Sequence, residues 1–598
     1  MSQQEKKDMA KHFYRASAAD FMKIPGSPVA YWASEDIINN FVHSDSIIDI
    51  GEPKKGLITA DNDRFMRLWY EVSWSNLGLG IGSSKDAYKS EKKWFPIDKG
   101  GKYRKWYGNN EYVVNWEHDG YEMREWERYL QEETNAGGRI VNEEYYFREG
   151  ATWSAISSGN LSVRFSEQGA LFSNAGLKLF CTDRECLNSI LGILNSYVST
   201  VFLDCISQTM NFEKGNVERI PFKKAEGVSE IVNKLVNIHK DDWDSYETSF
   251  GFKKPLFISG EEGVGRIRSA FEKVIIRTHS EVSEAFGLEE LLNEKVFFSY
   301  GLERGAEHVI RKENVTLSRN ACYRLARELT CEESRIFGIS EMSKELASYA
   351  VGSMMGRFSL GKSNLILASQ GETLQDYLAQ IPTPSFAPDE NAILPLTDQE
   401  WFPDDATNRF REFIRVVWGN EHLQENLDFV AESLCLHAIK SKRGESALDT
   451  IRRYLSTQFF KDHLRTYKKR PIYWLFSSGK HKAFECLVYL HRYNESTLAR
   501  MRTEYVIPLS AKLSAYADKL EQDKDASTST AETKRLEKEV ATLHKQQIEL
   551  AEFDEKLRHY ADQRISLNLD DGVKINYGKF GNLLAETKAV TGNKEALL

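Results

Sequence analysis

Hydrophobic and polar residues follow two different periods along the chain. From Ile47 to about Phe222, short β-branched and aromatic runs lie between Gly, Asn and Asp turns, which is the pattern of strands. From about Gly227 the period changes to 3.6 residues and stays there, which is the pattern of amphipathic helices. We therefore expect an α+β chain, with a mixed α/β domain followed by a large, mainly α-helical region.

The expected elements of the first part are short and mixed. A helix is expected after Ser34, a favourable N-cap that is followed by the acidic residues Glu35 and Asp36. Strands are predicted at residues 47–51, 111–116, 139–147, 161–165 and 177–181, and helices at 63–72, 121–133 and 186–210.

The second part is predicted to be helical almost throughout. Pro508 should kink or break the last long helix before the hairpin. Helices are predicted at 228–239, 264–282, 288–296, 318–336, 339–358, 409–418, 425–440, 447–460, 480–491 and 496–521. Residues 567–580 return to a strand-and-turn pattern.

Two further patterns divide this helical part. Five of the thirteen prolines lie between residues 382 and 403, which indicates a linker or an extended insert. Leucines repeat every seven residues from Leu536 to Leu557, which predicts a helical hairpin with residues 513–520. The expected domains are a tail or helix (1–22), a mixed domain (23–226), a helical spacer with its Pro-rich linker (227–400) and a helical C-terminal domain with a coiled-coil hairpin (401–598).

Composition limits the class of protein. With 598 residues and 41% hydrophobic content, the chain is long and apolar enough for several folded domains. Its net charge of −9 argues against a histone-like coat on nucleic acid but leaves room for a local basic surface. Seven scattered Cys without a CxxC pair, a polar N-terminus and no apolar run of about 18 residues predict a cytoplasmic protein with no membrane partner.

Each candidate motif of known chemistry lacks residues that the chemistry requires. The Gly78–Ser83 run lacks the third Gly of a dinucleotide loop, and the Gly260–Ile267 run lacks the Lys and Ser/Thr of a P-loop. No two prolines are adjacent, so the Asn/Asp-Pro-Pro-aromatic loop that holds a flipped base in amino-methyltransferases is absent. The spacing of the histidines and Cys486 in 463–491 fits no metal site. We predict no catalytic, cofactor-binding or metal-binding residues.

The strongest binding signal is the stretch 93–116, which mixes Lys and Arg with Trp, Tyr and Gly. Cations neutralise phosphates and flat rings stack on bases, so this composition is typical of a nucleic-acid surface. The alternative is a twisted hairpin whose rings are buried and whose cations are solvated. Candidate DNA contacts here are Lys99, Lys102, Tyr103, Arg104, Lys105, Trp106, Tyr107 and Asn109, with Asn110 as a further adenine reader.

Two other clusters join this set. Arg148, Trp153, Ser154 and Arg164 follow the aromatic Phe147. Residues 452–482 hold nine Lys or Arg against one Asp, and this excess predicts a second DNA-backbone contact or a docking face for a protein. The candidates there are Arg465, Lys468, Lys469 and Arg470.

Several longer motifs resemble one family. Residues 24–32 (IPGSPVAYW), 55–65 (KGLITADNDRF), 147–154 (FREGATWS) and 212–222 look like the hinge and target-recognition domain of fused adenine methyltransferases. The segments 467–474 (YKKRPIYW), 489–493 (YLHRY) and 570–577 (DDGVKINY) are similar to the PglX family, the adenine-specific DNA methyltransferases of BREX phage-defence systems. The resemblance runs from about residue 23 to about residue 580.

The resemblance implies a DNA-binding function without the catalytic half of the family. In such enzymes, residues like 23–226 form the DNA target-recognition domain, which binds double-stranded DNA and helps to present the flipped adenine for marking host DNA. The family's N-terminal half, which binds S-adenosylmethionine (SAM), has no counterpart here. The expected partners are therefore DNA, an N-terminal methyltransferase domain on the same or a separate chain, and other BREX proteins. The chain is a C-terminal piece, a split gene product or a truncated relative.

Two other functions stay open. One is a helical scaffold that assembles defence proteins. The other is a metal-dependent nuclease that uses Glu91 and Lys93, although the nearest upstream acid, Asp86, lies in the same turn-rich stretch.

Overall fold

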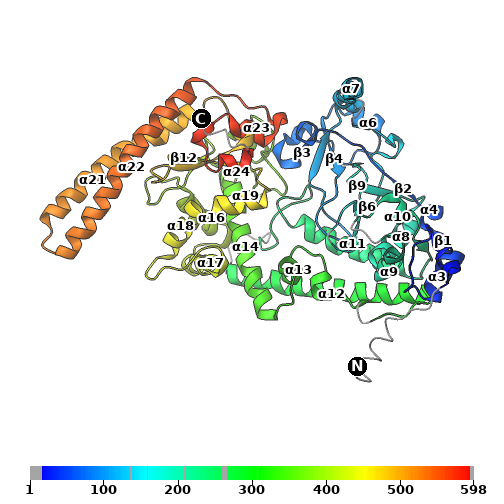
Figure 1. Ribbon diagram of the computed structural model, residues 1–598. Coiled ribbons are helices and arrows are strands. Elements are labelled where there is room, and N and C mark those ends of the chain that lie inside the picture. The colour runs from blue at the N-terminus through cyan, green and yellow to red at the C-terminus, as the bar shows by residue number, and fades with distance from the viewer. Residues whose placement is uncertain are drawn as a thin grey trace, which may run out of the picture. The chain divides into compact units, whose positions relative to one another are not determined.

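The computed structural model confirms the α+β class, with 54% helix and 10% strand (Figure 1). It describes residues 17–134, 138–157, 159–207, 211–258, 265–305 and 308–592. Most of the predicted tail 1–22 and of the 260–267 run lies outside these ranges. Two compact units interleave along the chain: unit 1 holds residues 1–66, 76–244 and 277–330, and unit 2 holds 67–75, 245–276 and 331–598. Whether the predicted domains fold independently stays a prediction.

Unit 1 is built on small sheets whose strands are buried. An antiparallel sheet has the order β2-β9-β6-β7, and all five residues of β6 are buried because both faces of this strand are covered. Strand β4 pairs antiparallel with β5 and parallel with β8, and β1 pairs with β10. The bounds are β1 (Asp45–Ser46), β2 (Glu52–Lys54), β3 (Met66–Leu68), β4 (Trp94–Asp98), β5 (Tyr112–Asn115), β6 (Gly150–Ser154), β7 (Val163–Ser166), β8 (Leu171–Phe172), β9 (Gly176–Phe180) and β10 (Pro221–Phe222).

Helices surround these sheets, and α8 packs on α11. Ser34 caps α3 as expected, since its hydroxyl accepts a hydrogen bond from the Ile37 amide. The helices are α2 (Ala18–Phe21), α3 (Glu35–His43), α4 (Ile47–Ile50), α5 (Asn62–Phe65), α6 (Ser84–Lys89), α7 (Glu117–Thr134), α8 (Arg184–Asn195), α9 (Tyr197–Ile206), α10 (Lys214–Glu218), α11 (Val228–Asp244) and α13 (Ala321–Leu325), with 3-10 turns η1 (Trp69–Glu71) in unit 2, η2 (Trp74–Asn76) at the change of unit, and η3 (Glu143–Tyr145) and η5 (Lys312–Asn314) in unit 1.

One helical break is set by side-chain hydrogen bonds. The predicted helix 186–210 is bent by 70° between α8 and α9. Asn195 at the bend bonds both the amide and the carbonyl of Val163, and Asn293 accepts from the Tyr197 amide. No single helix of the described ranges is long and apolar enough to cross a membrane, and this bent, mostly buried pair passes such a test by length and composition alone.

Unit 2 packs helices around a three-stranded antiparallel sheet of order β11-β13-β12. The insert at 382–403 is extended, and its β11 pairs with β13. The strands are β11 (Ile393–Pro395), β12 (Tyr473–Ser477) and β13 (Glu485–Tyr489). The helices are α14 (Cys331–Met354), α15 (Leu374–Gln380), α16 (Ala406–Trp418), α17 (Leu423–His437), α18 (Ala447–Thr457), α19 (Phe459–Thr466), α20 (Thr497–Arg500), α21 (Ile507–Ala526), α22 (Thr530–Asp562), α23 (Gly572–Gly578) and α24 (Thr587–Thr591), with η6 (Leu490–Arg492), the π-helical turn η7 (Met501–Val506), η8 (Leu569–Asp571) and η9 (Gly581–Leu583). The long helix α12 (Ile267–Tyr300) begins in unit 2 and ends in unit 1.

The predicted hairpin is confirmed by α21 and α22, drawn in orange in Figure 1. The four heptad leucines of α22 are buried, because they face the apolar side of α21. Pro508 lies in the first turn of α21, directly after the π-helical turn, where its missing N–H and its ring interrupt the regular helix.

Six secondary-structure expectations were wrong. Residues 318–336 are not one helix, since α13 ends at Leu325 and α14 begins at Cys331. Residues 480–491 form β13 rather than a helix, because their apolar residues pair with β12 and tertiary packing overrides periodicity. Residues 139–147 form a 3-10 turn, 47–51 a single helical turn, and 63–72 only the short α5 before β3 and η1. Residues 567–580 are mainly the helix α23 rather than strand and turn.

Candidate nucleic-acid interface

The loop from Lys99 to Asn110 joins β4 to β5 and has a fixed shape. Trp94 pairs with Asn115 at the base of this hairpin. Trp106 and Asn109 have positive φ angles of 70° and 62°. The side-chain amide of Asn109 donates to the Lys102 carbonyl at 2.8 Å, and this bond closes the tip of the loop. The turn of this loop is therefore fixed in part by contacts within the loop itself.

Arg104 is buried and bound by protein groups. Its guanidinium donates to the Thr316 carbonyl (3.0 Å) and to the Ser318 hydroxyl (2.8 Å), and it lies 3.9 Å from the Asp242 carboxylate. The rings of Trp243 and Tyr323 lie 4.8 and 5.8 Å from it. Such contacts offset the cost of taking a charge out of water.

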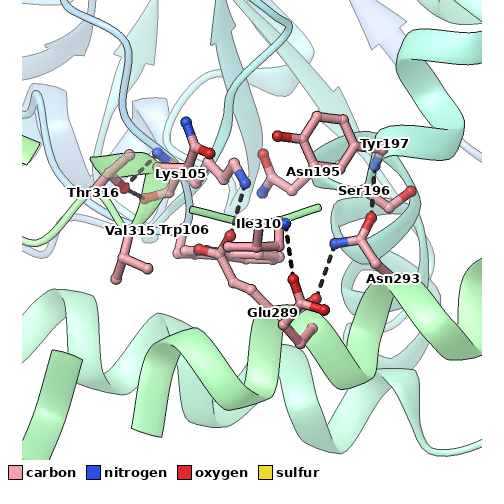
Figure 2. A network of polar contacts seen from close by, with 12 residues as sticks. Lys105, Trp106, Asn195, Ser196, Tyr197, Glu289, Asn293, Ile310, Val315 and Thr316 are labelled. Atoms are coloured by element: carbon pink, nitrogen blue, oxygen red, sulfur yellow. Dashed lines mark hydrogen bonds and ion pairs between the residues drawn. The ribbon is translucent and has the colours of Figure 1, made fainter. Parts of the chain in front are cut away.

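Lys105 and Trp106 share one carboxylate, as Figure 2 shows. The Lys105 Nζ lies 2.8 Å from Glu289 Oε2, and the Trp106 Nε1 donates to Glu289 Oε1 at 2.8 Å. Burial alone would lower the pKa of Lys105, but the facing Glu289 carboxylate outweighs burial and raises it. Glu289 belongs to α12, so a helix far along the sequence anchors this loop.

The cluster that follows Phe147 is also mostly internal. Trp153 donates to the Phe212 carbonyl, and Ser154 accepts a hydrogen bond from the Gly101 amide at 2.9 Å. Arg164 is fully buried, and burial lowers its pKa to about 10. Arg148 differs, because it is exposed with its guanidinium over the Tyr145 ring at 5.1 Å.

The exposed part of the loop is smaller than the sequence predicted. Lys102 is exposed, and Lys99, Tyr103 and Asn109 are half-buried, with the Lys99 ammonium 4.4 Å from the Tyr112 ring. Tyr107 is buried and donates to Glu167 at 3.0 Å. As DNA contacts, all these residues and those of the Phe147 cluster stay predictions. The structure adds that seven of them are buried inside unit 1, namely Arg104, Lys105, Trp106, Tyr107, Trp153, Ser154 and Arg164.

Residues 311–330 were missed by the sequence reasoning. The Tyr323 hydroxyl donates to the Tyr103 carbonyl at 2.5 Å, and the Lys105 amide donates to the Thr316 hydroxyl, so this segment packs against the loop. Its Arg324 and Arg327 are exposed and Arg319 is half-buried. The sequence assigned part of it to a helix at 318–336, and three arginines within nine residues were the signal that could have pointed to it.

The second predicted cluster, in unit 2, follows the end of α19. Arg465, Lys468 and Lys469 are exposed, and the two lysines have positive φ angles of 52° and 60°. Arg470 is half-buried, lies 3.8 Å from Glu71 and donates to the Val590 carbonyl at 3.4 Å. Three of the four predicted contacts therefore have exposed side chains, although Arg465 lies 3.5 Å from Asp462, and as DNA contacts they too stay predictions.

The other chemistries considered find little support in the geometry. No three His, Cys, Asp or Glu side chains of the described ranges lie together as a metal site would require. His463 and His491 are buried structural side chains bonded to backbone groups, whereas His481 is exposed. Asp86 accepts a hydrogen bond from Ser83 in the first turn of α6, and Glu91 is exposed.

Comparison with known proteins decides the family. No family model matches the chain. The adenine-specific methyltransferase BrxX of Escherichia coli O9:H4 (strain HS) is 45% identical over 579 residues, which are 96% of this chain and 46% of that protein. The adenine-specific methyltransferase PglX of Lacticaseibacillus casei (strain Zhang) is 34% identical over 593 residues, which are 97% of this chain and 46% of that protein. The chain belongs to the PglX/BrxX family.

Family membership covers nearly the whole chain, and it confirms the resemblance carried by the 467–474 and 489–493 motifs. The chain spans 46% of the length of both PglX/BrxX relatives. The match therefore includes both the anchored loop of unit 1 and the helical unit 2.

Proposed function

We propose that this chain supplies DNA recognition and binding to a SAM-dependent, adenine-specific DNA methyltransferase of a BREX phage-defence system. The observation that carries the proposal is the match of 96% of the chain to a protein named as an adenine-specific methyltransferase. The anchored loop at 99–110 supports it, because buried partners hold an exposed cationic tip in one geometry. A DNA-reading element needs such a fixed position to keep register on the duplex.

In the described ranges, neither of two runs with a glycine-rich or strand-then-glycine pattern fits SAM. Residues 47–51, predicted as a strand that ends in glycine, form a helical turn followed directly by β2. A Cβ at Gly78 would meet the Phe95 ring at 2.3 Å, so this glycine packs against a side chain of the chain itself and leaves no cradle for a ligand. Methyl transfer would therefore depend on a catalytic part other than the described residues, and the chain's own role is to bind and position DNA.

The proposed DNA contacts fall into two sets by accessibility. In unit 1, exposed Lys102 and Arg148 and half-buried Lys99, Tyr103 and Asn109 would contact phosphates or bases, together with Arg324 and Arg327 of the neighbouring segment. In unit 2, exposed Arg465, Lys468 and Lys469 would contact phosphates. The buried residues Arg104, Lys105 and Trp106 are positioning residues, because they hold the loop rather than reach out of it.

Fluorescence anisotropy with the whole chain and a labelled duplex tests the proposal. We expect binding that weakens steeply between 50 and 200 mM salt, since each neutralised phosphate releases counterions. The variant K102A/R148A should bind every duplex sequence more weakly. The slope of the logarithm of its binding constant against the logarithm of the salt concentration should be smaller by about 2. The matched control is K224A, which removes another exposed cation of unit 1 that is paired with Glu185.

Two results would redirect the assignment. Absence of binding at low salt would contradict the proposal and favour the helical scaffold. Cleavage that needs a divalent metal and disappears in E91A would favour the nuclease.

A further inference from the structure

Arg357 is a buried cation of unit 2 with few partners. It follows α14 and is completely buried, with its guanidinium 5.6 Å from the Trp69 ring and 5.5 Å from the Phe358 ring. Its Nη1 donates to the Tyr489 hydroxyl at 3.1 Å. Within the described ranges, its Nε and Nη2 have no hydrogen-bond partner. Burial raises the pKa of Glu247 to about 6 and the charge of Arg357 opposes this rise, so a buried carboxylate lies near the guanidinium, but Nε and Nη2 still lack an acceptor. Leaving buried donors unbonded is costly, which suggests a missing acceptor.

Other buried arginines of the same unit are paired. The guanidinium of Arg492 donates to the carbonyls of Asp389 and Glu390, both at 2.8 Å. The guanidinium of Arg67 donates twice to the Asp570 carbonyl, at 2.8 and 3.1 Å. The fold of unit 2 thus provides acceptors for these guanidinium groups, and Arg357 differs from them.

Two family motifs place further unpartnered groups around Arg357. Tyr473 of the 467–474 motif pairs with Tyr489 of the 489–493 motif across β12 and β13. In the part of unit 2 that the structure describes, the Tyr473 hydroxyl has no hydrogen-bond partner although its side chain is fully buried, whereas the buried Tyr467 hydroxyl faces the Glu247 carboxylate and helps to lower its pKa. A Cβ on Gly352, whose carbonyl accepts from the Arg357 amide, would lie 2.8 Å from the Tyr473 hydroxyl.

Two histidines complete the cluster with known tautomers. His463 Nε2 accepts hydrogen bonds from the Ile472 and Tyr473 amides at 3.1 Å, so its proton is on Nδ1. His491 Nε2 lies 3.1 Å from the Val72 carbonyl and must donate to it, which leaves Nδ1 as an acceptor. Both Nδ1 atoms are unpartnered in the described structure. Burial lowers the pKa of each ring to about 3, so both rings are neutral.

The cluster forms one electrostatic unit. Ring centroids lie 4.8 Å apart for His463 and Tyr473 and 4.5 Å apart for His463 and Tyr467. Burial is the main cause of the raised pKa values of Tyr467 and Tyr473 and of the lowered pKa values of the two histidines. The charge of Arg357 adds to the lowering for the histidines and opposes the rise for the tyrosines. All these groups therefore lie within reach of the same guanidinium.

Donors outnumber acceptors among the unpartnered atoms. The donors are Arg357 Nε and Nη2, the Tyr473 hydroxyl and His463 Nδ1, whereas His491 Nδ1 is an acceptor, and Glu247 faces Tyr467. An excess of N–H and O–H groups around one guanidinium suits a small oxyanion, whose oxygens accept two parallel bonds from Arg. We propose that the Arg357 cluster (Arg357, Tyr473 and His463) binds a small oxyanion inside unit 2, independently of the proposed DNA function.

Inorganic phosphate is the probe, and thermal unfolding of the whole chain is the measurement. At constant ionic strength, phosphate should raise the unfolding midpoint by about 2 °C or more over chloride. Y473F removes a hydroxyl that bonds no protein group, so without phosphate it should leave the midpoint unchanged or higher. It should also shrink the phosphate shift, and R357M should abolish it.

Y577F is the matched control. It removes a buried hydroxyl that donates to the Ala585 carbonyl, so it should lower the midpoint and leave the phosphate shift intact. Crystals grown with selenate should show anomalous density next to Arg357 Nη2. Equal midpoints in phosphate and chloride, or only water at Arg357 in that crystal structure, would overturn the proposal.

Discussion

The two basic clusters of this chain look alike in sequence and differ in structure. In unit 1, Arg104 and Lys105 alternate with aromatic residues and are buried against Asp242 and Glu289. In unit 2, Arg465, Lys468 and Lys469 follow the end of a helix and are exposed. The difference lies in what surrounds each cation, because residues far along the chain, Thr316 and Glu289, cover the backbone and the ammonium group of Lys105. Cations interleaved with rings are thus buried and anchor a loop, whereas the cations after α19 have exposed side chains.

The largest effect should come from the buried anchor. K105M leaves Glu289 charged and without its cation, and we expect it to lower the free energy of unfolding by about 3–5 kcal/mol. Denaturant titration measures this loss. Adding E289Q should recover part of it, since a neutral amide oxygen still accepts from Trp106. The matched control K102M changes an exposed residue of the same loop and should cost less than about 0.5 kcal/mol.

A loss below 1 kcal/mol in K105M would remove the distinction between anchor and tip. The loop would then be held mainly by its apolar rings.

The exposed cluster of unit 2 should control DNA affinity without affecting stability. R465A/K468A/K469A is expected to weaken duplex binding by about 10-fold to 100-fold at 0.1 M salt and to lower the salt slope by about 3. K519A/K534A/K538A removes three exposed cations of the hairpin and serves as the control. If both triple variants bind equally, net charge rather than the α19 cluster determines affinity.

The buried anchor should also make unit 1 sensitive to acid. His239, whose ring centroid lies 6.5 Å from that of Trp106, is buried, and burial lowers its pKa to about 3. Between pH 6.5 and pH 3 the unfolded chain binds a proton at His239 that the folded chain does not, so stability falls as pH falls. This residue should account for about 2 kcal/mol of the loss between pH 7 and pH 5.

H239Q should therefore reduce the difference in unfolding free energy between pH 7 and pH 5. The exposed His481 provides the control variant H481Q, which should leave that difference unchanged. An equal acid sensitivity in H239Q and the parent chain would show that His239 is protonated in the folded state.

The smallest effect concerns backbone strain in the exposed cluster. Lys469 has a φ of 60°, which glycine adopts without a Cβ penalty. K469G should change stability by no more than about 1 kcal/mol, most simply as a gain, while DNA binding weakens. Thermal unfolding and anisotropy on the same samples separate the two effects. A clear loss of stability would mean that the Lys469 side chain contributes to the fold.

Local sequence signals predicted much of the fold. Ser34 was identified as an N-cap, the heptad leucines as a hairpin, and residues 111–116 as a strand, because each depends on neighbours in the chain. The errors occurred where distant segments decide the structure. Residues 480–491 have an apolar pattern compatible with a helix, and only pairing with β12 makes part of them a strand.

The candidate interface shows the same division. Composition pointed to the loop at 99–109, and exposed Lys102 agrees with a surface role. Composition could not distinguish Lys102 from Lys105, because the partner that buries Lys105 is Glu289, 184 residues away. Arg324 and Arg327 were missed for the same reason, since Tyr323 reaches the loop only in the folded unit.

By itself, the sequence determined the α+β class, the helical hairpin and the PglX/BrxX family. Periodicity, caps and long motifs depend only on residues that are close together in the chain. Only the tertiary structure decided which cations are anchors and which are exposed. It also brought the 467–474 and 489–493 motifs together around Arg357. The physical reason is that burial and pairing depend on residues far apart in the chain, and these set the solvation of every charge.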